Sequence, residues 1–363
     1  MTDYSSSFGR PDLVDRPPPL DPEGRSTARV DESTQSLAGS DRLAWPDIAR
    51  GIGIILVVLG HSIGGMMTSG QVDRSGLLAR VFLFIYTFHM PLFFVLSGMF
   101  MPGRLARPTR ELVGGMLTRI AYPYFFWGLL QTAAIMTMAR FVNTPVPPDP
   151  SLFLRVLWEP PSQFWFLYSL ALFQIAAMIF GRYASLSLMV WLALAVRIIP
   201  EFVELPKALD FSARYWIFYA AAAALASALR SGLVTRWISG TRFAGLVVAW
   251  AAAAYAVTYW GGGYLSVWDL PAATLGTLLV LSISQAARLP FQDVLAELGR
   301  RSMPIFVTHV LIVAGTRIAF TLILGVHNPL PILLAATIAG LGLPYLFYDW
   351  AERRGLASIL ALR

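Results

Sequence analysis

The chain has 363 residues, of which 56% are apolar and only 13% are charged. Soluble domains carry about 25% charged residues, so this composition excludes an ordinary soluble protein and predicts a polytopic membrane protein. The sequence contains no cysteine, which excludes disulfides and thiolate metal sites, and we expect no bound metal or cofactor. The net charge of +7 comes almost entirely from arginine. We interpret it as loop charge that sets orientation, not as a nucleic-acid surface.

Residues 1–43 differ in composition from the rest of the chain. They include Pro17-Pro18-Pro19 and many Ser, Asp and Arg residues, and they lack an apolar run. A secretory signal needs a short apolar core behind a basic start, which is missing here. A polar segment of this kind cannot bury enough surface to fold, so we predict a disordered cytoplasmic tail over residues 1–43.

The remainder of the chain is rich in apolar segments of membrane-spanning length, which requires about 20 residues. Ten segments qualify: 45–66, 78–100, 113–138, 163–181, 184–200, 212–230, 241–260, 266–286, 302–324 and 329–350. We therefore predict an all-α bundle of about ten transmembrane helices over residues 44–352. A short basic cytoplasmic tail, residues 353–363, is expected to follow.

The charges between these segments predict the orientation of the chain. With the amino terminus in the cytoplasm, the inner loops carry Arg104, Arg107, Arg110, Arg119, Arg182, Arg230, Arg236, Arg242, Arg288, Arg300, Arg301, Arg353 and Arg354. The outer loops carry Asp73, Asp149, Glu159, Glu201, Glu204, Asp210 and Asp269, with Arg74, Arg155 and Lys207 among them. Cytoplasmic loops are enriched in Lys and Arg, so this pattern predicts that both termini are cytoplasmic.

The first predicted span carries the most informative pair of polar residues. Arg50 and His61 are eleven residues apart, which is about three helical turns, so their side chains share one face roughly 16 Å apart along the axis. Asp47 precedes Arg50 by three residues, the spacing of a helical side-chain pair. Ionisable residues within a membrane are costly and usually functional, so we expect a site on this face.

Two further histidines lie within predicted spans. His89 stands two residues before Pro91 in the second span, and a proline there leaves the carbonyl of Thr87 without its helical donor. His309 lies in the ninth span, whereas His327 falls in an outer loop and is taken as incidental. Such histidines can also bond a neighbouring helix without chemistry, an alternative that stays open for His89 and His309. Likewise, the inner arginines either set orientation alone or bind phosphates of a soluble donor.

Five segments together resemble the acyltransferase family 3 group of bacterial membrane proteins, which transfer acyl groups onto carbohydrates. These segments are Arg50 to His61 in its flanking sequence from Asp47, Phe88 to Gly98, Arg119 to Tyr124, Gln163 to Tyr168, and Leu298 to His309. They occur in the family's order over residues 42 to about 350. The first segment is most similar to the branch of fucose O-acetylases of nodulation-factor and polysaccharide systems.

The resemblance implies roles for particular residues. His61 is expected to be the catalytic base, with Arg50 serving the acyl donor and Asp47 orienting or balancing Arg50. We place Arg107, Arg110, Arg119, His89 and His309 at the donor site. Family members often carry two arginines three residues apart before the proline of the third motif. Here Arg107 and Arg110 have that spacing but lie earlier, and Met116 stands where a partner of Arg119 is expected. The acceptor is expected to meet Trp158, Trp165 and Trp268.

We therefore predict a multi-pass enzyme of the bacterial cytoplasmic membrane that moves an acetyl or other short acyl group from acyl-CoA, as co-substrate, to a carbohydrate hydroxyl. The expected partners are acyl-CoA, a carbohydrate acceptor and the lipid bilayer, with no nucleic acid. Two other classes stay open at this point. Buried histidines also serve proton relays in transporters, so a proton-coupled exporter of a glycan or small metabolite is an alternative. A structural membrane component without chemistry is the third.

Overall fold

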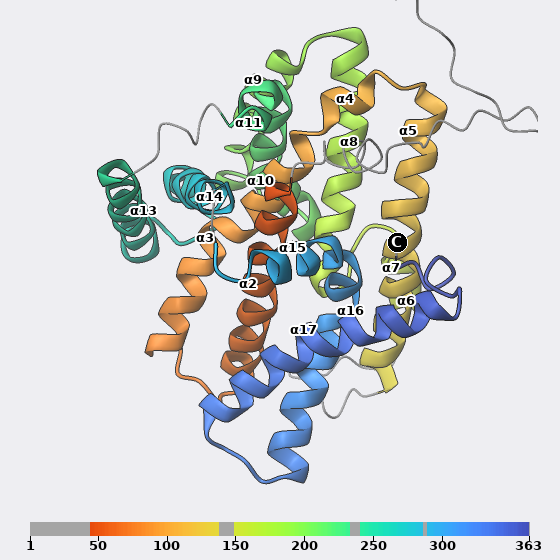
Figure 1. The fold of residues 1–363 in the computed structure, drawn as a ribbon, viewed down its shortest axis with the longest axis vertical. Helices are drawn as coiled ribbons and strands as arrows, with labels where there is room; N and C mark the ends of the chain where they lie inside the picture. The colour runs from red at the N-terminus through yellow and green to blue at the C-terminus, as the bar shows by residue number, and fades with distance from the viewer. Residues whose placement is uncertain (1–43, 138–148, 233–239, 286–288, 363) are drawn as a thin grey trace, which may run out of the picture. The chain divides into compact units, whose positions relative to one another are not determined.

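The computed structural model describes residues 44–137, 149–232, 240–285 and 289–362 (Figure 1). Every regular element in these ranges is helical, and no strand occurs in them, so the predicted all-α fold is confirmed. Residues 44–363 form one compact unit by their internal contacts. The predicted tail over residues 1–43 lies outside the described residues.

The helices follow one another along the chain with short connections. Their bounds are α2 Trp45–Thr68, α3 Leu77–Gly98, α4 Met101–Leu105, α5 Thr109–Met116, α6 Tyr122–Thr137, α7 Ser151–Arg155, α8 Trp165–Tyr183, α9 Leu186–Val196, α10 Lys207–Ala224, α11 Ala226–Arg230, α13 Thr241–Tyr259, α14 Leu270–Ser284, α15 Gln292–Arg300, α16 Ser302–Ile318 and α17 Pro329–Arg353. A π-helical turn, Leu117–Ala121, joins α5 to α6, and a second one, Ala319–Ile323, ends α16.

Local sequence explains where several helices begin. The Ser185 side chain accepts a hydrogen bond from the backbone N–H of Leu188 and so caps α9. Asn328 caps α17 in the same way, with Pro329 at the first helical position, where its missing N–H costs nothing. These capping hydrogen bonds fix the residues at which α9 and α17 begin.

Seven helical segments in the described residues are long and apolar enough to span a membrane. They are Trp45–Thr68, Leu77–Leu105, Ser162–Tyr183, Thr241–Tyr259, Val267–Ser284, Ser302–Ile323 and Pro329–Arg353. Three further predicted spans correspond to α6, α9 and α10. Of these, α9 has only 11 residues and α6 only 16, while α10 begins with a charged end at Lys207 and Asp210. The chain is thus a helical membrane protein, and the count of ten and the orientation stay predictions.

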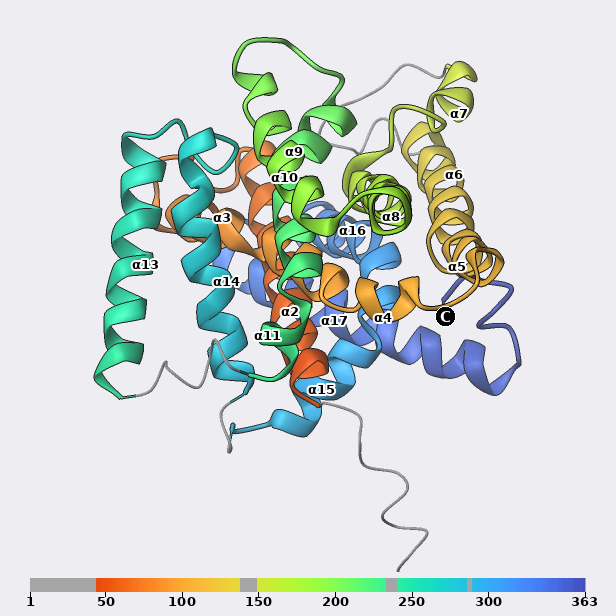
Figure 2. The ribbon, with the colours of Figure 1, turned by 90° about the horizontal axis from the view of Figure 1, so that it is seen from above.

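Helix α2 is the centre of the bundle, where it packs against α3, α14, α15, α16 and α17 (Figure 2). Helices α13 and α14 stand at one edge, and α5 and α6 at the opposite edge. Helix α15 was not expected from the sequence, because its charged residues made that stretch resemble a loop. It contacts α2 so closely that a Cβ on Gly51 would lie 1.9 Å from the carbonyl oxygen of Leu295.

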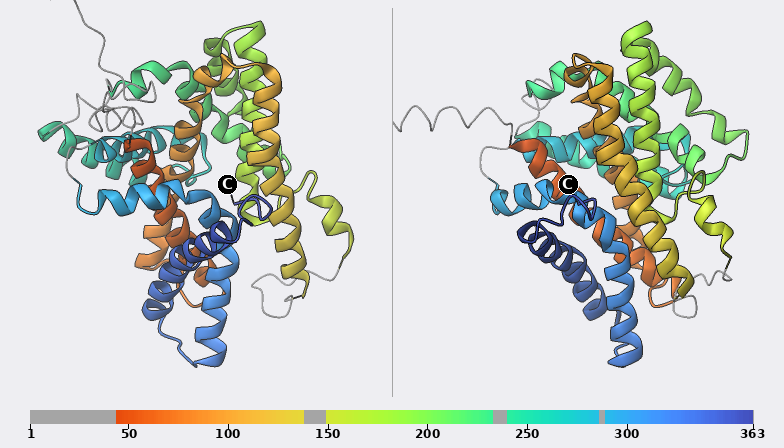
Figure 3. Two further views of the ribbon diagram at one scale, coloured as in Figure 1. Left: turned by 45° about the vertical axis from the view of Figure 1, so that its right-hand side comes forward. Right: turned by 90° about the vertical axis from the view of Figure 1, so that its right-hand side faces the viewer.

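The segment α5–α6 forms a rod beside α8 (Figure 3), and the end of the chain packs against it. This end includes residues 353–363, which were predicted to form a short basic cytoplasmic tail. In the part of it that the structure describes, Ala357 and Leu362 are buried, and the indole of Trp127 donates a hydrogen bond to the carbonyl of Leu360 at 2.8 Å. The phenol of Tyr122 donates another to the carbonyl of Ile359. Apolar residues in this last segment explain why it packs on the bundle.

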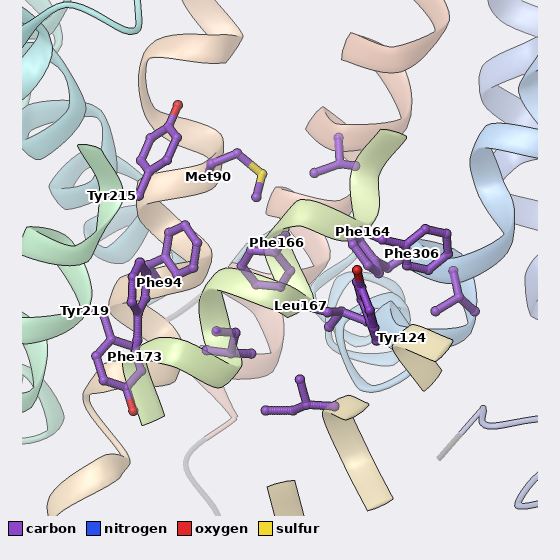
Figure 4. Close-up of a cluster of buried hydrophobic side chains, with 14 of the residues drawn as sticks. Met90, Phe94, Tyr124, Phe164, Phe166, Leu167, Phe173, Tyr215, Tyr219 and Phe306 are labelled. Carbon is purple, nitrogen blue, oxygen red and sulfur yellow. The ribbon is translucent and has the colours of Figure 1, made fainter. Parts of the chain in front are cut away.

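A row of aromatic rings fills the bundle beside α3 (Figure 4). The ring centroids of Phe94 and Phe166 are 4.9 Å apart, and those of Phe166 and Phe306 are 5.5 Å apart. Met90 points from α3 toward the middle of this row. The row therefore joins α3, α8 and α16 near Met90, a residue that lines two cavities of the bundle.

Candidate functional site

The larger of the two cavities has a volume of about 440 Å³ and lies toward the C-terminal end of α2. His61 of α2 and His89 of α3 line it, together with Trp165 of α8, Lys207 of α10 and Arg317 of α16. It is called the outer cavity below, after the predicted orientation. Five elements that are distant in sequence therefore meet around the two histidines.

The smaller cavity, of about 150 Å³, lies toward the N-terminal end of α2. Arg50 of α2 and Arg119 of the π-helical turn line it, with Ser97 of α3 and Ser302 of α16. It is called the inner cavity below. Met90 lines both cavities, so its flexible side chain stands between the histidines and the arginines. The eleven-residue spacing in α2 thus places Arg50 and His61 on one helix face but in different cavities.

The third intramembrane histidine, His309, packs against His61. The ring centroids of His61 and His309 are 5.0 Å apart in an edge-to-face arrangement. Nδ1 of His309 lies 3.0 Å from the carbonyl of Ile305 and 2.8 Å from that of Phe306. This nitrogen must carry the proton to donate to a carbonyl, so Nε2 is left as an acceptor. Nε2 is buried and has no hydrogen-bond partner in the described residues.

His89 is fixed by its own helix in the same manner. Its Nδ1 donates to the carbonyl of Ile85 at 2.9 Å, and its ring packs edge-on against Tyr86 with centroids 4.6 Å apart. His89 and His61 line the same cavity. The structure therefore brings three intramembrane histidines together, although the sequence spacing could relate only residues within one helix.

The Arg50 guanidinium is held by an ion pair with a buried carboxylate. Its Nη1 lies 2.7 Å from Oδ1 of Asp47, which is 4% exposed. Helix α15 packs closely on the backbone of α2 at this pair, because a Cβ on Gly299 would lie 1.8 Å from the carbonyl oxygen of Asp47. The predicted pairing of Asp47 with Arg50 is therefore present, and it orients the guanidinium at the inner cavity.

The other predicted site residues divide between the cavities and the surface. Trp165 lines the outer cavity and stacks on Tyr215, with centroids 5.4 Å apart. Trp158 and Trp268 are 55% and 73% exposed and line neither cavity. Of the three predicted donor arginines, Arg119 lines the inner cavity, whereas Arg107 and Arg110 are exposed and line neither.

Of the two histidines predicted at the donor site, His89 lines the outer cavity and not the inner cavity of Arg50 and Arg119, and His309 lines neither. Several lining residues were not anticipated. These are Tyr86, Tyr215 and Tyr264 with Arg74, Lys207 and Arg317 in the outer cavity, and Met90 between the two. Among these residues, only Lys207 stood out by its residue type, because it is the one lysine in the sequence. In the described residues, no group of three His, Asp or Glu side chains is arranged to hold a metal ion.

A bundle of membrane-spanning helices with titratable groups lining internal cavities is typical of integral-membrane enzymes and transporters. The chain belongs to the acyltransferase family 3, because the model of this family, described as an acyltransferase domain, matches residues 43–349. It is similar to the nodulation protein NolL of Sinorhizobium fredii, with 28% identity over 169 residues, 46% of this chain and 44% of that protein. Its identity to NolL of Mesorhizobium japonicum is 28% over 153 residues, 42% of this chain and 39% of that protein.

The chain thus aligns with less than half the length of the curated relatives it matches. No solved structure matches it significantly. The family is shown by the match over most of the chain. The identity of the donor, of the acceptor and of the reacting residues depends on the geometry of the site itself.

Proposed function

We propose that this protein transfers an acetyl group from acetyl-CoA to a hydroxyl of a carbohydrate, within the bacterial cytoplasmic membrane. The observation that carries the proposal is that Met90 lines two cavities, one with Arg50 and Arg119 in its wall and the other with His61 and His89. A transferase with a cytoplasmic donor and an external acceptor needs such a meeting point. The family membership and the two NolL relatives support an acyltransferase.

The donor enters the inner cavity in this proposal. Guanidinium groups bind phosphate oxygens bidentately, so Arg50 and Arg119 suit the phosphates of CoA. Arg104 lies near enough to Arg107 and Arg119 for their positive charges to act on it, which makes this end of the bundle attractive to an anion. The thioester then reaches the histidines past Met90, whose unbranched side chain can move aside more easily than a β-branched one.

The reaction is a direct acyl transfer. His61 accepts the proton of the sugar hydroxyl while that oxygen attacks the thioester carbonyl carbon. The tetrahedral intermediate collapses, the carbon–sulfur bond breaks, and the CoA thiolate takes the proton from His61. His309 packs edge-to-face on the His61 ring, with centroids 5.0 Å apart, and so positions that ring. Trp165 and the tyrosines of the outer cavity offer aromatic faces to the acceptor ring.

The test is acceptor-dependent release of CoA thiol by the purified protein in nanodiscs, with the acetylated sugar identified by mass spectrometry. His61→Ala is expected to abolish both signals, because no other side chain replaces the base. His327→Ala is the matched control, since His327 is an exposed loop histidine that lines neither cavity. Full activity in the His61→Ala protein contradicts the assignment of the base. Acid-driven sugar flux without any acyl donor supports the transport alternative instead.

A further inference from the structure

The outer cavity is positively charged. Arg74 of the α2–α3 loop, Lys207 at the start of α10 and Arg317 of α16 all line it, and no Asp or Glu is among its lining residues. Outer loops of a membrane protein ordinarily carry few basic residues. Two basic residues of the predicted outer loops, Arg74 and Lys207, face this one cavity.

Two arginines outside the cavity on the predicted outer side, Arg155 and Arg214, are paired with carboxylates. Arg155 lies 3.8 Å from Asp149 and 4.0 Å from Glu159. Arg214 lies 2.7 Å from Glu201 and 3.1 Å from Asp210. These pairs show that acidic side chains are available on this side and are used where the charge has only a structural role.

The three lining cations lack such partners. In the described residues, no ion pair or side-chain hydrogen bond involves the charged groups of Arg74, Lys207 or Arg317, and Lys207 only lies 5.7 Å from the Phe211 ring. Arg317 is 8% exposed. A buried guanidinium without a counter-charge is costly, so its retention at a cavity wall indicates a ligand that supplies the charge.

The nearest acidic neighbour in sequence is engaged elsewhere. The Asp73 carboxylate accepts hydrogen bonds from the backbone N–H of Ser75 at 3.0 Å and from its hydroxyl at 2.6 Å. These hydrogen bonds hold the pKa of Asp73 below its ordinary value, so the carboxylate stays ionised and directed at Ser75. It therefore does not neutralise Arg74.

We infer that the outer cavity takes an acceptor with a phosphate or carboxylate group, so that the acceptor is an anionic sugar and not a neutral one. This inference rests on the proposed function, since it names the substrate class of the same site. The anionic group meets Arg317, Lys207 and Arg74, and the hydroxyl to be acetylated faces His61. Lys207 and His61 line the same cavity, so one ligand in that cavity can face both.

The test compares three matched sugars by calorimetric binding to the full-length protein in phosphatidylcholine nanodiscs: glucose, glucuronate and glucose 6-phosphate. Either anionic sugar is expected to bind at least about tenfold more tightly than glucose, since charge-assisted hydrogen bonds are roughly twice as strong as neutral ones. Lys207→Gln and Arg74→Gln are each expected to weaken anionic binding about threefold to tenfold, with little effect on glucose.

Arg155→Gln is the matched control, because it removes an outer charge that is paired and does not line the cavity. Arg317→Gln is expected to lose the most affinity for the anionic sugars. If this buried change prevents folding, the double variant Arg74→Gln, Lys207→Gln tests the same positive charge at exposed positions. Equal affinity for the three sugars, or equal losses in Arg155→Gln, overturns the inference. So does a loss of acetyl-CoA affinity instead of sugar affinity in Lys207→Gln, because the cavity would then hold the donor.

A second arm separates a sugar anion from a lipid headgroup. Binding of glucose 6-phosphate is expected to be the same in phosphatidylglycerol and phosphatidylcholine nanodiscs, and its loss in phosphatidylglycerol would show that a lipid phosphate fills the cavity. Failure of the proposed function gives a different result. A wild-type protein that binds anionic sugars selectively but releases no thiol refutes the transfer reaction alone, whereas equal acetylation of neutral and anionic sugars refutes the inference alone.

Discussion

At the scale of single residues, the site depends on histidines whose tautomers are set by their own helices. In His89 and His309, Nδ1 donates to a carbonyl three or four residues earlier, so each presents Nε2 to its surroundings as an acceptor. The edge-to-face contact of His309 with His61 then places an acceptor beside the proposed base. A histidine in this position acts through its neighbour and is a positioning residue.

Replacement of His309 separates this role from simple packing. Gln retains an acceptor oxygen near the position of Nε2, whereas Phe fills the space without one. We expect kcat for thiol release to fall about a hundredfold in His309→Phe and much less in His309→Gln, in line with the size of general-base effects. KM for acetyl-CoA is expected to stay unchanged in both. Equal losses in the two variants would show that His309 only packs.

The arginines predicted to meet the donor differ in whether they line the inner cavity. Arg119 lines it and Arg110 does not, although both were predicted to meet the donor. We expect Arg119→Gln to raise KM for acetyl-CoA about tenfold, the effect of losing a charge-assisted phosphate contact, and Arg110→Gln to change it less than twofold. Steady-state thiol release measures both. The reverse order would move the donor site toward the α4–α5 loop.

At the scale of elements, the approach of α15 to α2 fixes the Asp47–Arg50 pair. A Cβ on Gly299 would meet the backbone of α2 and not a flexible side chain, so α15 has to move away. We expect Gly299→Ala to lower the free energy of unfolding by about 2 kcal/mol and to reduce activity. Gly342→Ala in α17 is the control, since a Cβ there meets nothing within 4 Å. Thermal unfolding in detergent measures both, and equal midpoints would contradict the close packing.

Helix α15 is also linked to α16 and α17 by a charged cluster. Glu297 accepts hydrogen bonds from Arg300 and from Arg301, and Arg301 also pairs with Asp349 of α17. Burial raises the pKa of Glu297, but the hydrogen bonds from these arginines outweigh it and hold the pKa below the ordinary value of 4.5.

The stability that Glu297 contributes is therefore present above the ordinary pKa and lost as pH falls through the lowered value. We expect Glu297→Gln to lower the unfolding midpoint by about 2 °C at neutral pH, for a partly exposed pair of about 1 kcal/mol. The difference from wild type is expected to vanish in acid. Glu159→Gln is a control in a more exposed pair. A difference that grows in acid would contradict the lowered pKa.

At the scale of the whole molecule, the roles of the two cavities depend on orientation. The chain has no cysteine, so single cysteines can be introduced at exposed positions. We expect Glu204→Cys to react with a membrane-impermeant maleimide in intact cells, and Ala106→Cys to react only after permeabilisation. The opposite pattern would place the cavity of His61 on the cytoplasmic side and exchange the expected sites of donor and acceptor.

Some features were accessible from the sequence because they depend on local periodicity and composition. The apolar segments predicted an all-helical membrane protein, and the Arg50–His61 spacing placed both on one face of α2. The pairing of Asp47 with Arg50 also follows from a spacing of three residues. Helix α15 was missed since its charged residues lack a membrane-spanning pattern, and the role of its one glycine, Gly299, is visible only in its contact with α2.

Periodicity relates residues within one helix, whereas a cavity depends on how separate helices pack. For this reason the sequence by itself determined the class of fold and the histidines and arginines worth examining. Only the tertiary structure decided that His61, His89 and His309 meet, that Arg119 faces the inner cavity while Arg107 and Arg110 do not, and that Met90 stands between the two cavities. It also gathered Arg74, Lys207 and Arg317 from three distant segments around one space.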